Sequence, residues 1–323
     1  MADQPKPNES TDRDASPAPR DEAGASSPSD AAPRDSQTPD AGAPGVEDIA
    51  EKLQRGGHVV ICNWNSKGEA IIRELHSEVI HDKRLVVIVT DKELPKRIGS
   101  AWRGVFTVDG NPLEREYLLQ AMITKAHSAI VLADEASPNP DTANFMIAAC
   151  IERINPDVHT IVEISQSSYL EHFQGTGVDE MICINEIAEK IISQSCLTHG
   201  LSALYLHLLT ASEETNEIYI LPAPQVTHGH TYRDVRRAIG TFEGESLILL
   251  GFLAQVDGVE APPGYRAFSR DGKRMAMVVN PMQNDESTNP LSQSYVIRPG
   301  DELILMAYEQ PELRGFTVQR SRK

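Results

Sequence analysis

The residues best placed to bind a ligand lie in one short loop, residues 63–68, which reads Asn-Trp-Asn-Ser-Lys-Gly. The loop follows an apolar run at residues 58–62 and precedes a helical pattern. A dinucleotide site places G-x-G-x-x-G at this point, because glycines let backbone amides approach a pyrophosphate at the helix N-terminus. Of the three glycines, only the last is present, as Gly68.

Asparagines stand at the other two glycine positions, and they affect the loop differently. Asn63 can hold a tight turn, because Asn enters the left-handed backbone region more readily than most residues. Asn65 instead places a side chain where a phosphate must approach the backbone. Asp91, 23 residues after Gly68, stands where a ribose-binding acid would, although acids are also common in turns. Nucleotide binding and a degenerate loop kept as scaffold both stay open, and the second is favoured.

Histidines, tryptophans and cysteines give three further candidate sets. His228 and His230 lack nearby third and fourth ligands, so a turn is favoured over a metal site. Trp64 and Trp102 fit packing anchors better than ligand stackers, although Trp64 belongs to the candidate loop. No C-x-x-C spacing is present, which favours buried thiols over disulfides or zinc. The cysteines are Cys62, Cys150, Cys183 and Cys196.

Six short apolar runs must form the strands that position these residues. They are β-branched and almost continuously apolar, as in parallel strands covered on both faces. Helical patterns at residues 68–80, 112–122, 141–154 and 167–173 separate them. With right-handed crossovers, the alternation predicts an α/β fold with a doubly wound, Rossmann-like parallel sheet. The runs are residues 58–62, 85–89, 104–108, 129–132, 160–163 and 180–184.

An apolar helical arm at residues 186–212 follows this first domain, residues 46–185. Isoleucines and leucines recur along the arm, and Gly200 interrupts it, which predicts two helices. An apolar stripe of this kind must be buried against something. Packing on a second subunit is favoured, and packing on the next domain of the same chain is the alternative.

The rest of the chain predicts a small β-rich α+β domain at residues 213–310, ending in a basic tail at 311–323. Four strand-like runs, residues 217–221, 246–250, 275–279 and 302–306, accompany one short helix at 231–239 with Thr231 as its cap. At the other end, residues 1–45 contain no Val, Ile, Leu, Phe, Trp or Tyr. That composition cannot offset the entropy of ordering, so a disordered leader is expected.

Charge and missing motifs exclude several classes of protein. The chain has 323 residues, and 30 basic minus 47 acidic side chains gives a net charge of −17. Such a balance argues against nucleic acid as a partner, since phosphate binding needs concentrated Lys and Arg. No secretory signal, membrane-spanning run, Walker loop or G-x-S-x-G elbow is present, so a cytoplasmic location and no enzymatic activity are expected.

Five segments together resemble the RCK family, the regulators of potassium conductance. The resemblance covers nearly all of residues 58–307 and implies an N-terminal Rossmann-like domain and an RCK C-terminal domain. The segments are 58–64 (His-Val-Val-Ile-Cys-Asn-Trp), 108–112 (Val-Asp-Gly-Asn-Pro), 126–134 (Ala-His-Ser-Ala-Ile-Val-Leu-Ala-Asp), 158–163 (Val-His-Thr-Ile-Val-Glu) and 298–304 (Arg-Pro-Gly-Asp-Glu-Leu-Ile).

The resemblance implies a ligand-sensing regulatory subunit of a potassium channel or a Trk/Ktr-type transporter. Its partners would be copies of itself, in a homodimer or ring, and a membrane pore subunit at the inner face of the membrane. The ligand is unknown, with Ca²⁺ or an adenine nucleotide as candidates. The nucleotide-binding members imply a site at Asn63, Trp64, Asn65, Gly68, Asp91 and Asp109. The calcium-gated type implies a metal site with Glu163 and Asp134.

Two other functions remain open on the sequence. One is a free-standing Rossmann protein that binds a nucleotide or a cation without any channel. The other is an NAD-dependent oxidoreductase, which the incomplete glycine loop disfavours. Measured binding of NAD(H), ATP, ADP and Ca²⁺, together with the oligomeric state, would separate these possibilities.

Overall fold

A computed structural model describes most of the chain beyond residue 50. The predicted leader, residues 1–45, lies outside the described residues, and so does most of the basic tail. The described residues are 51–77, 83–95, 98, 102–173, 176–210, 212, 214–242, 246–256, 266–270, 273–282, 290–313 and 316–318.

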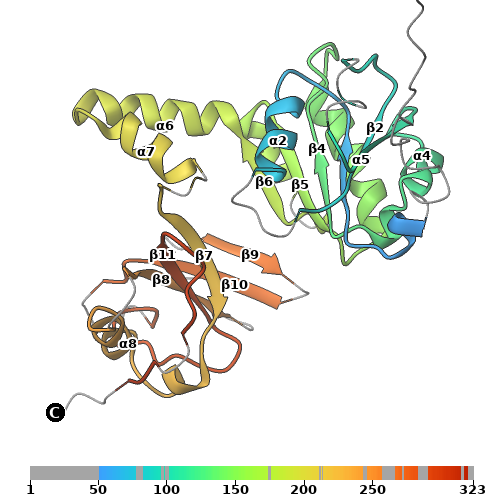
Figure 1. The fold of residues 1–323 in the computed structure, drawn as a ribbon. Coiled ribbons are helices and arrows are strands. Elements are labelled where there is room, and N and C mark those ends of the chain that lie inside the picture. The colour runs from blue at the N-terminus through green and yellow to red at the C-terminus, as the bar shows by residue number, and fades with distance from the viewer. Residues whose placement is uncertain are drawn as a thin grey trace, which may run out of the picture. The chain divides into compact units, whose positions relative to one another are not determined.

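Six parallel strands form the first sheet, in the order β3-β2-β1-β4-β5-β6. Figure 1 labels β2, β4, β5 and β6 of this sheet. This is the doubly wound order, in which successive strands are added to one side of β1 up to β3 and then to its other side from β4 onward. The predicted Rossmann-like sheet is therefore confirmed, with each strand within two residues of its predicted run. The strands are β1 (Val59–Cys62), β2 (Val86–Thr90), β3 (Val105–Asp109), β4 (Ser128–Val131), β5 (His159–Ile164) and β6 (Glu180–Cys183).

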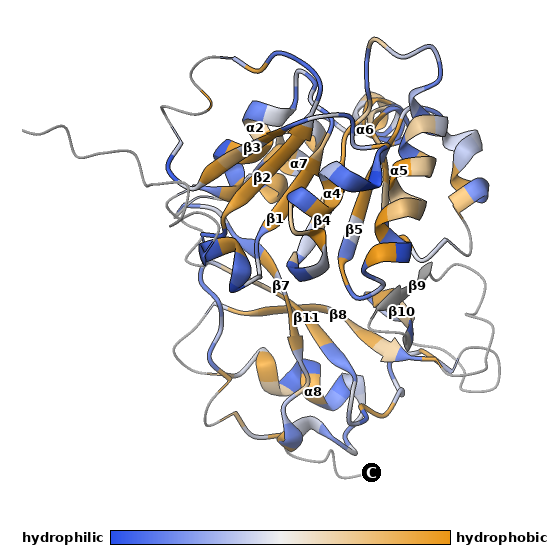
Figure 2. Ribbon diagram, turned by 90° about the vertical axis from the view of Figure 1, so that its right-hand side faces the viewer, coloured by the Kyte–Doolittle hydropathy of each residue, from blue (hydrophilic) through white to orange (hydrophobic). Residues whose placement is uncertain are grey.

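Helices cover both faces of this sheet, which explains why β1 and β2 are apolar at almost every position (Figure 2). Val60 belongs to a core cluster with residues of α4 (Arg115–Gln120) and α5 (Pro140–Ile154). Its neighbour Ile61 belongs to a second cluster, with a residue of α2 (Gly68–Leu75). Successive side chains of a strand point to opposite faces, so each face needs its own apolar set.

Three helix predictions need small corrections. The pattern at residues 112–122 forms α4 and then the 3₁₀ turn η1 (Ile123–Lys125), because Met122 adopts a left-handed φ of 54°. The pattern at residues 167–173 is a 3₁₀ helix, η2 (Ser167–Phe173). The helix predicted from Gly68 ends at Leu75, and residues 78–80 lie outside the described part.

The predicted arm forms two helices, α6 (Ile184–Leu197) and α7 (Leu201–Leu209). Gly200 separates them with a φ of +84°, as its position in the sequence predicted. A hydrogen bond of 2.5 Å from Tyr205 Oη to Gln194 Oε1 joins the pair. Neither helix has a buried residue. The arm therefore exposes its apolar side chains within the described part of the chain.

A second domain is built on a five-stranded antiparallel sheet in the order β7-β11-β8-β10-β9, as the α+β prediction required. The helix α8 (Tyr232–Ile239) packs on its core, and the Thr231 side chain caps that helix by accepting from Asp234 N at 3.2 Å. Strand β9 was missed, since its Arg-Ala-Phe-Ser-Arg sequence has no apolar run. The strands are β7 (Glu217–Pro222), β8 (Ile248–Gln255), β9 (Arg266–Arg270), β10 (Lys273–Val279) and β11 (Glu302–Ala307).

The cysteine prediction holds for some thiols and is wrong for one. Cys62 and Cys183 are buried and Cys150 is partly buried, but Cys196 is exposed because α6 buries none of its residues. All four are free. Burial raises the pKa of the Cys62 thiol to about 12, so it stays protonated and unreactive at neutral pH.

Candidate functional site

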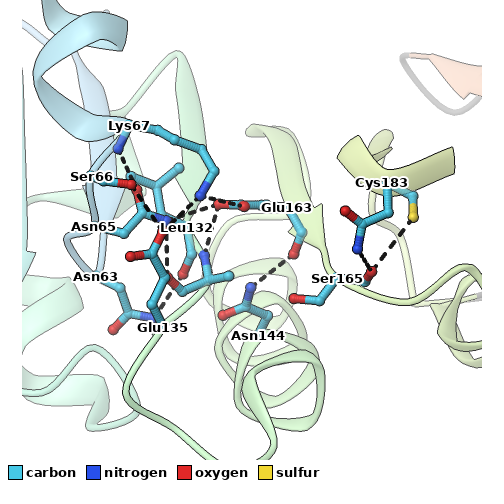
Figure 3. A network of polar contacts seen from close by, with 12 residues as sticks. Asn63, Asn65, Ser66, Lys67, Leu132, Glu135, Asn144, Glu163, Ser165 and Cys183 are labelled. Atoms are coloured by element: carbon cyan, nitrogen blue, oxygen red, sulfur yellow. Dashed lines mark hydrogen bonds and ion pairs between the residues drawn. The ribbon is translucent and has the colours of Figure 1, made fainter. Parts of the chain in front are cut away.

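The candidate site lies at the carboxyl edge of the parallel sheet, where the loop after β1 meets the ends of β4 and β5 (Figure 3). This is the point at which the strand order reverses, and open α/β sheets bind ligands there. The sequence predictions fall on this edge because each candidate residue lies at or just beyond the end of a parallel strand.

Asn63 makes the tight turn that follows β1. Its φ of 66° is left-handed, as predicted for this position. Its Nδ2 donates to Leu132 O at 3.0 Å, which joins the turn to the segment after β4. Asn63 thus supplies the backbone angle of a glycine and adds a hydrogen bond that a glycine would lack.

Trp64 and Gly68 are held together by packing. Trp64 is only 9% exposed and belongs to the same core cluster as Ile72. A Cβ atom at residue 68 would lie 2.5 Å from Trp64 Cζ3, closer than real atoms approach. The Trp64 ring therefore requires the glycine here, and the prediction of a packing tryptophan is confirmed.

Asn65 occupies the loop with its own side chain. Its Oδ1 accepts from Lys67 N at 3.0 Å, and its carbonyl oxygen accepts from Gly68 N at 3.2 Å. Its Nδ2 donates both to Ala133 O and to Glu163 Oε2, each at 3.0 Å. A pyrophosphate would need the two loop amides that Asn65 already binds.

Lys67 places an ammonium group between two carboxylates at this edge. Lys67 Nζ lies 3.1 Å from Glu163 Oε1 and 3.0 Å from Glu135 Oε1. Partial burial works to lower the pKa of Lys67, but the hydrogen bonds that Lys67 donates to both carboxylates outweigh it and raise the pKa. The hydrogen bond from Lys67, with a second from Ser66, lowers the pKa of Glu135. Lys67 and Glu135 are therefore both charged at neutral pH.

Glu163, which the resemblance places in a metal site, is fully engaged by the chain itself. Its side chain is 11% exposed, and Oε2 accepts from Asn65 Nδ2 and from Ala133 N at 3.0 Å each. Oε1 faces Lys67. The backbone oxygen of Glu163 also accepts from Asn144 Nδ2 at 2.8 Å, which fixes the end of β5 against α5.

Asp134, the second carboxylate of the implied metal site, has a lysine of its own. Lys92, in the segment after β2, donates to Asp134 Oδ1, which also accepts from Ala136 N at 2.9 Å. Partial burial works to raise the pKa of Asp134, but these two hydrogen bonds outweigh it and lower the pKa. Among the described residues, no group of three or more His, Cys, Asp or Glu side chains is arranged to hold a metal ion.

The structure brings some of the predicted site residues together and not others. Asn65 and Glu163 are in direct contact, and Asn63 is bonded to the segment that leads to Asp134. Asp91 and Asp109 are exposed after β2 and at the end of β3. His228 lies in the turn before α8 with Nε2 at 3.0 Å from Ala223 O, which fits the predicted turn.

Three charged residues of this edge were missed in the sequence, namely Lys67, Lys92 and Glu135. A lysine inside a loop that otherwise receives phosphates was the available signal for Lys67. Glu135 adjoins Asp134, so the acidic pair after the fourth apolar run was visible as well. Their pairing was not visible, because the partners are separated by more than forty residues.

Fold and site together define a class: a Rossmann-like domain whose phosphate loop is filled by its own side chains, followed by a helical arm and a small antiparallel domain. Residues 59–184 match the family model of the TrkA-N domain. The six-stranded domain thus matches the TrkA-N family, and the resemblance to the RCK family is confirmed.

The relatives of known function that match this chain are potassium channels. The calcium-gated potassium channel TvoK of Thermoplasma volcanium is 25% identical over 182 residues, which is 55% of this chain and 50% of TvoK. Potassium channel protein 1 of Methanocaldococcus jannaschii is 22% identical over 161 residues, 50% of this chain and 46% of that protein. This chain thus spans about half the length of either relative.

Among solved structures, the human SLO3 gating ring is similar in fold over most of the chain. The human SLO3 gating ring matches with a TM-score of 0.56 and 16% identity, covering 81% of this chain and 46% of that structure. The match extends beyond the TrkA-N domain, so the order of Rossmann-like and antiparallel domains is one already seen in a gating ring. At this identity the likeness concerns the fold alone.

Proposed function

We propose that this protein is a regulatory subunit that controls the conductance of a potassium channel or transporter. A ligand would change the shape of a dimer or ring of the chain, and the assembly would act on the pore. The TrkA-N domain and the named potassium channels among the relatives support this proposal. The observation that carries it is the exposed apolar arm that directly follows the TrkA-N domain.

The arm exposes a group of large aliphatic side chains to solvent. Burying one large aliphatic side chain is worth about 1.5–3 kcal/mol, and contiguous exposed apolar patches mark interaction sites. A second copy is the partner we favour, since two equal arms can bury the same patch on each other around a twofold axis. The exposed residues are Ile184, Ile187, Ile192, Leu197, Leu204, Leu206 and Leu209.

The pore would come from outside the described part of the chain. None of the helices in that part is both long and apolar enough to cross a bilayer. We therefore propose a membrane subunit as the second partner and a location at the inner face of the membrane. This protein would itself act by binding a ligand and not by catalysis.

The ligand would bind at the carboxyl edge of the parallel sheet, with an adenine nucleotide or Ca²⁺ as candidates. Asn63, Trp64, Asn65, Gly68, Asp91 and Asp109 would serve a nucleotide, and Glu163 and Asp134 a cation. A ligand can shift the assembly only if it binds one shape more tightly than the other. Either ligand would have to compete with contacts that the chain already makes there, including the Lys67–Glu163 ion pair.

Light scattering on the full-length protein tests the assembly. A dimer or a larger ring at micromolar concentration is expected, and a strict monomer would contradict the proposal. Calorimetry with NAD(H), ATP, ADP and Ca²⁺ tests the ligand. A free-standing sensor, the second candidate, would bind a ligand as a dimer but would fail to copurify with a coexpressed potassium pore protein.

A further inference from the structure

Lys67 lies where a bound cation would lie at this edge of the sheet. Its Nζ contacts carboxylate oxygens from two separate segments, Glu135 after β4 and Glu163 in β5. The backbone of Lys67 is itself fixed, because its N–H donates to Asn65 Oδ1. The ammonium is therefore tethered to the loop after β1 and joins it to two other strand ends, as Figure 3 shows.

Glu163 needs a positive neighbour in this position. Its side chain is nearly buried, and a buried carboxylate is stable only when it is paired and hydrogen-bonded. Asn65 and Ala133 supply two neutral donors to Oε2, and Lys67 supplies the charge at Oε1. Without the ammonium, Oε1 of Glu163 and Oε1 of Glu135, which also accepts from Ser66, would both lose their positive partner.

A divalent cation would compete for the same oxygens. Calcium binds oxygen ligands at about 2.3–2.6 Å and needs six to eight of them. The ammonium, at 3.0 and 3.1 Å from its two carboxylate oxygens, excludes a second positive charge both by volume and by repulsion. Loss of the ammonium, but not of the side-chain stem, would leave the two carboxylates open to a metal.

We propose that the Lys67 ammonium takes the place of a bound cation. It holds the loops after β1 and β4 against β5 without a ligand, and it prevents divalent cations from binding at this edge. Lys67 is a specificity-determining residue of the site. The inference concerns the edge used in the proposed function, and it bears on which of the two candidate ligands can bind there. It needs neither assembly nor a channel, so a monomeric chain would contradict the proposed function and leave this inference standing.

The test replaces the ammonium in the full-length protein and measures thermal unfolding and calorimetric heat with Ca²⁺ and with Mg²⁺. Lys67→Met keeps the stem, and Lys67→Arg keeps the charge. The wild-type protein and the Arg variant are expected to give no heat and no shift in Tm in millimolar Ca²⁺. The Met variant is expected to unfold at lower temperature in chelator and to recover stability as Ca²⁺ is added, because binding to the folded state alone raises Tm.

Three further variants keep the test decisive if Lys67→Met folds poorly. Lys67→Met combined with Glu163→Gln removes both charges, so it should be more stable than the single variant in chelator and should not respond to Ca²⁺. Lys92→Met is the matched control, since it removes the other lysine of this edge. Calcium binding by the wild-type protein that Glu163→Gln abolishes would overturn the inference. So would a Lys67→Met variant with neither loss of stability nor gain of calcium binding, or a double variant no more stable than the single one.

Discussion

At the scale of single residues, the site shows that one residue type can replace glycine in two different ways. Asn63 replaces the conformational freedom of a glycine, because its φ is left-handed. Asn65 stands at the second glycine position and takes the place of the ligand. Its side chain binds the amide of Lys67, which a nucleotide would use, and the carboxylate of Glu163, which a cation would use. The hydrogen bonds of these two side chains therefore hold the loop in place without a bound phosphate.

Asn65→Gly tests whether this side chain stabilises the loop. The variant restores a glycine of the dinucleotide pattern but loses three side-chain hydrogen bonds, so the free energy of unfolding should fall by about 1–3 kcal/mol in urea denaturation. Asn139→Gly is the control, because Asn139 precedes α5 without a side-chain capping bond and should cost a few tenths of a kcal/mol. Equal losses in the two variants would contradict the role of Asn65.

The ion pair between Lys92 and Asp134 predicts a small acid dependence of stability. Hydrogen bonds lower the pKa of folded Asp134. Its contribution is therefore complete above the unfolded pKa of about 3.9 and is lost as pH falls through the lower, folded value. Lys92→Met should weaken this dependence by less than about 1 kcal/mol, because the pair is partly exposed.

Urea unfolding from pH 6 to pH 2 would measure this effect. The wild-type and Lys92→Met curves should converge toward the acid end, where Asp134 is protonated in both. Curves that stay parallel over the whole range would show that the pair does not contribute through the Asp134 charge.

At the scale of elements, the junction of β1 and α2 depends on the contact between a ring and a glycine. The Trp64 ring fills the space beside Gly68 that a Cβ atom would need. The same glycine that would approach a phosphate in a dinucleotide site here lets a helix start against a buried tryptophan. The packing of the Trp64 ring is thus sufficient by itself to require a glycine at residue 68.

Gly68→Ala should therefore destabilise the fold even though alanine favours helices. The added methyl group would overpack the Trp64 ring, and the expected loss in the free energy of unfolding is about 1–3 kcal/mol. Gly240→Ala after α8 is the matched control and should be nearly neutral, since a Cβ atom there would lie 3.5 Å from Arg236 O, an ordinary contact distance. Chemical denaturation followed by tryptophan fluorescence gives both values, and a neutral Gly68→Ala would disprove the packing argument.

At the scale of the whole molecule, the chain combines two domains with separate cores and an arm with none. Each domain buries its own apolar residues, so each can fold around its own sheet. The arm is different, because its isoleucines and leucines find no cover in the described part of the chain. The proposed assembly supplies that cover, and it would let a ligand at one sheet edge affect a second subunit.

Charged substitutions on the arm should separate assembly from folding. Ile192→Glu and Leu206→Glu place a charge on the exposed stripe of α6 and α7, so light scattering should show a lower mass with an unchanged circular dichroism spectrum. Val226→Glu is the control, since Val226 is also exposed but lies outside the arm. A mass that is unchanged in both arm variants would refute the arm as the interface.

The sequence by itself determined the elements of this fold, because a strand buried on both faces and an amphipathic helix differ in how often apolar residues recur. It also determined the turn at Asn63 and the break at Gly200, since backbone angles are a local property. Strand β9 escaped detection because antiparallel pairing with β10, not an apolar run, holds it in place.

Only the tertiary structure decided what the carboxyl edge contains. Lys67 and Glu163 lie 96 positions apart in the sequence and meet because β1 and β5 flank the same neighbour, β4. Composition and spacing show only which charged groups the chain contains. Whether Glu163 contacts a lysine or a metal ion depends on which strands lie next to each other in the sheet. The physical reason is that electrostatic interactions depend on distance in space, which the order of the sheet sets.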